Sequence, residues 1–303
     1  MRKDLFYREE IMERDYIIAT ASTCDLTRDY LDEHQIPFIS YSYVMDGKEY
    51  EDDCREETRS ETYRQMREGK LLSTSAINMY TYRDFFESLI KDCVKPVIFL
   101  DMTRPLSSSY KFCEEAIEDL KETYPDSNII NVDTRCVSGG LGMLVKNVCK
   151  MYEAGESMET VLSWIEENKL KIAHRFTVDD LNWLKRGGRV SNASAIVGTI
   201  LSIKPVLYVP DEGTLVAANK VRGRKTALNS IIESIKNDLK DTSSPEFLIN
   251  HADCLLDAEY VRDKLREIYP DAKFSISGLG VVIGAHCGPG LFTIFYMTDA
   301  RRP

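Results

Sequence analysis

Long apolar runs are missing from this chain of 303 residues. No segment approaches the roughly 18 consecutive apolar residues of a membrane span. The first residues, MRKDLFYREEIMERD, alternate charges and lack the apolar stretch of a signal peptide. These absences predict a cytoplasmic protein without stable membrane insertion.

The common catalytic and cofactor motifs are also missing. The chain has no P-loop, no G-x-G-x-x-G after a strand, no G-x-S-x-G and no H-E-x-x-H. Its eight cysteines form no C-x-x-C pair and no Cys/His cluster at zinc spacing, so we expect reduced thiols, no metal and no cofactor. Cys287 is adjacent to His286, but neighbouring side chains seldom point at each other, which disfavours a catalytic pair.

Positive charge is scarce. The formal net charge of −10 disfavours nucleic acid as a partner, because binding a phosphate backbone requires a dense field of Lys and Arg. With 43% hydrophobic and 29% charged residues, the composition is that of an ordinary globular protein, and 303 residues favour two domains.

The first half of the chain contains three units of the same type, each made of a short β-rich run, a polar segment and a helical pattern. The strands are expected near 16–20, 97–101 and 129–132, and this alternation predicts a parallel sheet. Ligands bind such sheets beyond the carboxyl ends of the strands, where the three polar segments fall. Each hydroxyl there is equally suited to capping the helix that follows.

Between the first two units we expect an exposed charged helix over 55–68 and a hydroxyl-bearing loop over 71–78. Thr81 and Asp84 form a capping-box pattern ahead of a helix that carries Phe85 and Phe86.

The pattern changes near residue 165. The sequence then predicts a strand, a short helix from Val178 that ends at two glycines, an apolar helix over 192–201, a β-hairpin over 205–220 and a helix over 224–240. Further strands are expected in EFLINHADCL and on both sides of a turn, GAHCGPG, that holds His286. The predicted fold class is α/β, with an N-terminal parallel-sheet domain (1–165), a C-terminal mixed-sheet domain (166–303) and a ligand in the cleft between them.

Seven motifs follow one another in an order that resembles the DegV family of bacterial fatty-acid-binding proteins. They are ASTCDL (21–26), MDGKEYEDD (45–53), STSAIN (73–78), PLSSSY (105–110), LKRGGRVS (184–191), KVRGRKTA (220–227) and GAHCGPG (284–290). The chain departs from the family pattern at Ala21, Ala76, Ile77, Arg104 and Ser108.

The resemblance implies a two-domain carrier that encloses one long-chain fatty acid and presents its carboxylate to a separate fatty acid kinase, which forms an acyl phosphate. The implied carboxylate ligands are Thr74, Ser75, Thr103, Arg104, Ser107, Ser109 and His286. The implied contacts of other kinds are Ser22, Thr23, Gly139, Gly140, Gly284 and Gly288 with the ligand, Arg189 and Arg222 with the partner or a phosphate, and Ile196, Ile200 and Leu201 with the acyl chain.

Each assignment has an ordinary structural alternative. His286 can bind a head group or merely cap a turn, and the basic residues can form a positive rim or a solvated face. The aliphatic residues near 196–201 suit an acyl tunnel and a plain core equally well. Arg104 can pair with a carboxylate or point to solvent. The alternative functions are a hydrolase or phosphotransferase with Ser107 or Ser109 as nucleophile and His286 as base, and a lipid-sensing regulator.

Overall fold

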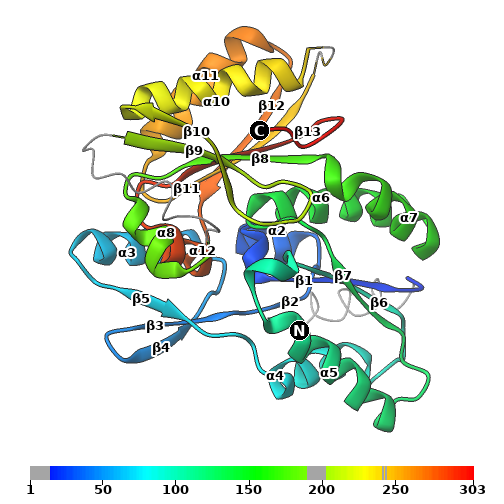
Figure 1. The fold of residues 1–303 in the computed structure, drawn as a ribbon. Coiled ribbons are helices and arrows are strands. Elements are labelled where there is room, and N and C mark those ends of the chain that lie inside the picture. Colours follow the sequence, from blue (N-terminus) through cyan, green and yellow to red (C-terminus); the bar gives the residue numbers. More distant parts are fainter. Residues whose placement is uncertain (1–13, 190–202, 241, 243) are drawn as a thin grey trace.

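The computed structural model describes residues 14–189, 203–240, 242 and 244–303. The expected apolar helix over 192–201, with Ile196, Ile200 and Leu201, lies outside these residues. Two large sheets with helices around them form the body of the protein, and a small third sheet lies beside them (Figure 1).

The first large sheet is parallel throughout and has the strand order β2-β1-β6-β7. The predicted βα units are confirmed. The apolar run in β6 is buried at every position, as expected for a central parallel strand. The elements of this part are β1 (Ile17–Ala21), α2 (Arg28–Glu33), β2 (Phe38–Ile39), β6 (Val97–Asp101), α5 (Ser109–Thr123), β7 (Ile129–Asp133), α6 (Gly139–Glu153) and α7 (Met158–Asn168).

The segment between the first two units forms the small antiparallel sheet, in the order β4-β3-β5. Its elements are β3 (Ser42–Met45), β4 (Lys48–Glu51), α3 (Glu56–Arg67), β5 (Leu72–Thr74) and α4 (Met79–Ile90). Residues 72–74 were expected in a loop but pair with β3. The expected capping box is also wrong: α4 begins earlier, and the Asn78 side chain accepts a hydrogen bond from the Thr81 N–H.

Helix α3 is not a fully exposed charged helix, because one of its faces is buried. The Arg59 side chain is 1% exposed, and its guanidinium donates to the carbonyl oxygens of Leu26 and Gly278, both at 2.8 Å. Arg59 therefore ties α3 to the segment after β1 and to the end of β12 (Lys273–Gly278). These carbonyl groups form a cage around the Arg59 guanidinium. They belong to segments that are distant in the sequence, so the local charge pattern could not predict the cage.

The second large sheet is mixed, in the order β10-β9-β8-β13-β11-β12, with one parallel pair, β11 and β12. The predicted hairpin is confirmed, since β9 and β10 pair antiparallel. The elements of this part are β8 (Ile172–Thr177), α8 (Leu181–Gly187), β9 (Ile203–Tyr208), β10 (Val216–Arg222), α10 (Arg224–Asp238), β11 (Glu246–His251), α11 (Leu255–Ile268), α12 (Val281–Cys287) and β13 (Phe292–Met297).

The two faces of the mixed sheet pack differently. Helices α10 and α11 cover one face (Figure 1) and enclose a separate apolar core that includes Ile231, Phe247 and Phe292. The other face meets the beginning of α6 at very short range. A Cβ atom on Gly140 would lie 2.0 Å from His174 Nε2, so only glycine permits this approach.

The segment around His286 is a helix and not a turn between strands. Residues 281–287 form α12, with His286 in its last turn, and the chain leaves the helix at Gly288 with φ 77°. The expectation was wrong because small and β-branched residues in GVVIGAHC suit both structures. Figure 1 shows α12 beside α8, between the small sheet and the mixed sheet. In the part of the chain that the structure describes, no helix is long and apolar enough to cross a membrane.

Candidate functional site

A cavity of about 160 Å³ lies where the parallel sheet, the mixed sheet and α12 meet. This volume is about ten times the ~15 Å³ that a single water molecule requires. The mixed sheet contributes side chains of β8 and β13 to its wall, and the parallel sheet contributes the segments that follow β6 and β7. Eleven bulky apolar side chains line the wall: Met102, Leu106, Val137, Phe176, Val209, Leu215, Leu279, Val282, Ile283, Leu291 and Phe295.

Thr74 and His286 form a polar part of this wall. Thr74 ends β5, and its hydroxyl lies 2.8 Å from His286 Nε2. On the other side of the ring, Nδ1 faces the Gly187 backbone: a Cβ on Gly187 would lie 2.9 Å from it. In the neutral tautomer with the proton on Nδ1, Nε2 accepts from the Thr74 hydroxyl; in the other tautomer, Nε2 donates to it.

Burial, followed by the charge of Arg189, lowers the pKa of His286 to about 4. The ring is therefore neutral near pH 7. In the tautomer with the proton on Nδ1, a carboxylate placed against Nε2 would meet a lone pair, and a nearby anion favours uptake of a second proton by the ring.

Hydroxyl and guanidinium groups continue the polar wall. Ser75, Ser107 and Ser108 line the cavity, and Arg189 lines it from the segment after α8. Arg189 donates to the Gly187 carbonyl at 2.6 Å and to the Leu106 carbonyl at 3.4 Å. It therefore bridges α8 and the segment after β6.

Ser109 lies behind this wall. It does not line the cavity, and its hydroxyl accepts from Ser107 Oγ at 3.0 Å and from the Ile77 N–H at 3.1 Å. It is buried, and its contacts hold the 73–78 segment against the 103–109 segment. Ser109 therefore positions Ser107 in this structure.

A second polar group reaches the cavity at Ser138, the residue before α6. Its hydroxyl donates to Asp25 Oδ2, and its backbone has the uncommon φ of 57°. Burial raises the pKa of Asp25 to about 7, against the opposing charge of Arg59.

His174 on β8 and Thr293 on β13 also line the cavity. The sequence did not predict Ser138, His174 or Thr293 as wall residues. Because alternate side chains of a strand share a face, His174 joins Phe176 and Thr293 joins Phe295 in the wall.

Other residues that the family resemblance implied do not line the cavity. Thr103 is fully buried, and its hydroxyl has no hydrogen-bond partner in the described residues. Arg104 turns away from the cavity: it pairs with Glu114 at 2.6 Å and lies over the Tyr110 ring. Arg222 is exposed at the end of β10.

The small residues of the implied set act in packing. Ser22 and Thr23 are buried, and Ser22 Oγ accepts from the Tyr41 N–H at 3.1 Å. The four glycines each lie against a side chain, and added Cβ atoms would clash with them. The contacts are Gly139 with Asn250, Gly140 with His174, Gly284 with Tyr63, and Gly288 with Trp183.

An outer depression of about 190 Å³ shares Thr74, Arg189 and His286 with the inner cavity. Leu71, Trp183 and Arg186 line its outer part. Leu71 is 56% exposed, and the Arg186 guanidinium lies 4.2 Å from the centroid of the Trp183 ring. The polar wall therefore separates an apolar interior from an accessible surface.

These features define the class: an α/β protein in which a parallel and a mixed sheet enclose an apolar cavity with a polar wall. The chain belongs to the DegV family, whose profile, described as an uncharacterised protein of the DegV family, matches residues 16–299. A DegV domain-containing protein of Clostridium perfringens is 36% identical over 291 residues, which are 96% of this chain and all of that one. The resemblance seen in the motifs is confirmed.

Several solved structures that are similar to this chain are those of fatty-acid-binding proteins. A fatty-acid-binding DegV family protein of Thermus thermophilus matches with a TM-score of 0.84 and 26% identity, over 94% of this chain and 99% of that one. A stearic-acid-binding protein of Eubacterium ventriosum matches with a TM-score of 0.84 and 25% identity, over 94% and 98%. Bacillus subtilis DegV, a fatty-acid-binding protein, matches with 0.81 and 25%, over 94% and 100%.

Proposed function

We propose that this protein binds one long-chain fatty acid, with the acyl chain in the apolar cavity and the carboxylate at the polar wall, and presents the carboxylate to a separate kinase that forms an acyl phosphate. The observation that carries the proposal is the convergence of Thr74, Ser107, Arg189 and His286, from four distant segments, on one apolar cavity. The fatty acids bound by similar structures support the same ligand.

The acyl chain supplies the affinity. Removing about 14 methylenes from water at roughly 0.8 kcal/mol each gives about 11 kcal/mol of gross driving force. The costs of association reduce this figure. The eleven apolar side chains of the cavity wall are the surface that receives the chain.

The carboxylate is held by donors that the apolar wall lacks. The Thr74 hydroxyl shares a hydrogen bond with His286, and its hydrogen can turn to an incoming carboxylate oxygen. Proton uptake converts His286 Nε2 into a second donor, and Ser75, Ser107 and Arg189 lie on the same wall. A buried carboxylate without such partners would cost several kcal/mol.

Presentation to a kinase is supported by the outer depression. Because Thr74, Arg189 and His286 belong to both hollows, a carboxylate held by them faces the depression, where the exposed Leu71 and the stacked Trp183 and Arg186 offer a contact surface. His286 Nε2 pairs with Thr74 and not with Ser107 or Ser109, which favours the carrier over the hydrolase.

Lipid extraction tests the binding step. The purified protein is denatured and extracted with organic solvent, and the extract is measured by mass spectrometry against the protein concentration. We expect about one fatty acid per chain in protein made in a lipid-replete host. An empty protein that also fails to take up added oleate or stearate overturns the proposal.

A coupled assay tests the presentation step. The loaded protein is incubated with ATP and a purified bacterial fatty acid kinase, and acyl phosphate is trapped with hydroxylamine. We expect turnover in the wild type and at least a tenfold loss in Leu71→Glu and Arg186→Glu, with the fatty acid content unchanged. Equal turnover in wild type and variants excludes the depression as the docking surface, and bound fatty acid with no turnover by fatty acid kinases excludes presentation.

A further inference from the structure

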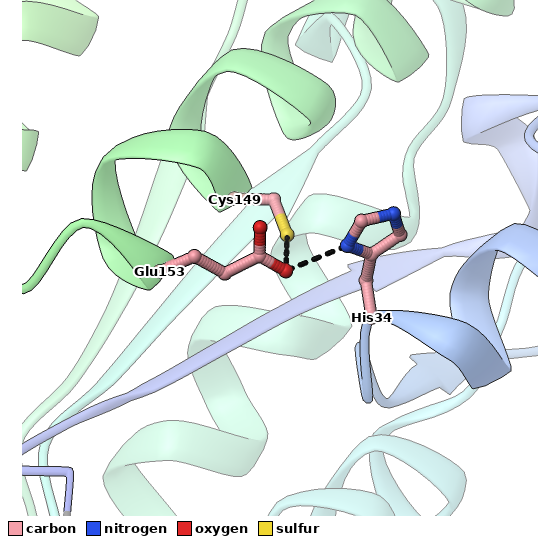
Figure 2. Close-up of side chains that lie close together, drawn as sticks. All are labelled: His34, Cys149 and Glu153. Atoms are coloured by element: carbon pink, nitrogen blue, oxygen red, sulfur yellow. Dashed lines mark hydrogen bonds and ion pairs between the residues drawn. The ribbon is translucent and has the colours of Figure 1, made fainter.

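Three side chains of metal-ligating type converge at the end of α6, away from the cavity (Figure 2). Cys149 and Glu153 project from successive turns of α6, and His34 follows the last residue of α2. His34 Nδ1 lies 2.6 Å from Glu153 Oε1, and Cys149 Sγ lies 3.4 Å from the same oxygen. One ligand atom from each residue falls within 4.8 Å of the other two.

The residue types narrow the choice of ion. A thiolate, an imidazole and a carboxylate together favour a borderline divalent ion such as Zn²⁺ over Mg²⁺ or Ca²⁺, which prefer oxygen ligands. Three protein ligands leave the fourth tetrahedral position for water or an external ligand. The thiolate and carboxylate charges together balance a divalent cation.

Two of the spacings between the ligand atoms can be compared with those of a tetrahedral zinc site. Zinc bonds of about 2.3 Å to sulfur and about 2.1 Å to nitrogen and oxygen place tetrahedral ligand atoms roughly 3.3–3.6 Å apart. The distance from sulfur to carboxylate already has this length. The contact of His34 with Glu153 must open by roughly 0.7 Å, and the Glu153 side chain is 39% exposed, so it is free to shift.

Burial and neighbouring charges shift the pKa values of Cys149 and Glu153. Burial, and then the charge of Glu153, raise the pKa of the Cys149 thiol to about 12. Burial opposes ionisation of Glu153, but hydrogen bonds with His34 and Cys149 outweigh it and lower the pKa of this carboxyl. Arg14 stabilises both anions electrostatically, and Lys146 lies over the nearby Tyr30 ring. A metal ion must therefore displace the thiol proton and compete with Arg14.

We propose that His34, Cys149 and Glu153 form a three-ligand site for Zn²⁺ or a similar divalent transition metal ion, with a fourth position open to solvent. The site is separate from the cavity, because Ser138 precedes the first turn of α6 and Cys149 lies eleven residues further on, about 16 Å along the helix axis. A bound ion would fasten the end of α2 to α6.

Cobalt titration tests the proposal, because Co²⁺ substitutes for Zn²⁺ and reports its ligands. The full chain, free of any affinity tag and stripped with EDTA, is titrated with Co²⁺ at pH 7.5. We expect one equivalent of tetrahedral Co²⁺, a near-ultraviolet charge-transfer band from sulfur to cobalt, displacement by Zn²⁺, and release of about one proton per ion from Cys149.

Variants assign the ligands. Cys149→Ser is expected to abolish the charge-transfer band, and Glu153→Gln and His34→Gln to weaken binding at least tenfold. Cys93→Ser, at an exposed thiol, and Glu156→Gln, at an exposed carboxylate, should bind Co²⁺ as the wild type does. Should Cys149→Ser unfold, the two partly exposed ligands still decide the question. A missing charge-transfer band, or equal affinity in all variants, means adventitious metal only and overturns the site.

Discussion

Thr74 and His286 stand 212 residues apart in the chain, and their side chains share a hydrogen bond of 2.8 Å. The bond connects the last residue of β5 to the last turn of α12. The Thr74 hydroxyl that we propose as a donor to the carboxylate is therefore held against the imidazole ring.

Replacing Thr74 by valine removes this donor and keeps the shape of the side chain. A hydrogen bond to a charged group contributes about 1.5–3 kcal/mol, so we expect oleate to bind about tenfold to a hundredfold more weakly. Displacement of a fluorescent fatty acid measures the loss. Thr81→Val, at an exposed position of α4, is the matched control and should bind normally. Equal affinity in the two variants would remove Thr74 from the proposed head-group site.

The pKa of His286 predicts a dependence of stability on pH. The folded protein holds this pKa at about 4, below the ordinary value of about 6.5. Between these values the unfolded chain binds more protons, so the contribution of His286 to the free energy of unfolding is present above pH 6.5 and is lost as the pH falls towards 4.

His286→Asn isolates this contribution, because other titrating groups cancel when the two proteins are compared. Urea unfolding of ligand-free protein should show the wild type losing up to about 3 kcal/mol relative to the variant between pH 7 and pH 4. Parallel curves for the two proteins over this range would show that the ring is not held neutral in the folded state.

Arg59 is predicted to be one of the most sensitive positions for stability. Removing its guanidinium leaves the buried Asp25 and Asp52 without their nearby cation and breaks its bonds to Leu26 and Gly278. Breaking a buried charge network of this kind costs about 3–5 kcal/mol. We expect that loss in urea unfolding of Arg59→Met.

Arg64→Met on the same helix is the control for Arg59→Met. Its side chain is 58% exposed and pairs with Glu61 and Glu68. Exposed pairs contribute about 0–1 kcal/mol, so this variant should unfold close to the wild type. Similar losses in the two variants would contradict the carbonyl cage around Arg59.

A larger side chain in the cavity should select shorter fatty acids and leave the binding of the carboxylate unchanged. Leu215 is buried in the loop of the β9–β10 hairpin and lines the cavity. Leu215→Trp is expected to shift the extracted fatty acids towards shorter chains, because the larger ring takes space from the acyl chain. Leu256→Trp, at a position that is 81% exposed on α11, should leave the chain-length profile unchanged. An unaltered profile in Leu215→Trp would place the acyl chain elsewhere.

The sequence predicted most of the architecture, because periodic patterns are local. Each βα unit, the hairpin of β9 and β10 and the helix α10 formed where the apolar spacing indicated. The errors fell where local pattern is ambiguous. GVVIGAHC has the composition of a strand but folds as α12, and LST has the composition of a loop but pairs with β3.

The candidate site was predictable only in part. Thr74, Ser75, Ser107 and His286, which the family motifs implied as carboxylate ligands, all line the cavity, and so does Arg189, which they implied as a partner or phosphate contact. Arg104 does not line it and pairs with Glu114 instead. The glycines of the motifs are required for close packing. The sequence pattern does not distinguish this requirement from a contact with a ligand.

The position of β13 has a consequence for the order of folding. This last strand lies between β8 and β11. These two earlier strands therefore cannot join in one sheet until the ribosome has made residues 292–297. Leu291, Thr293 and Phe295, which line the cavity, are delivered by the same late event. A growing chain therefore lacks one side of the cavity until this strand has been made, and under the proposed function the cavity can enclose a lipid only after that point.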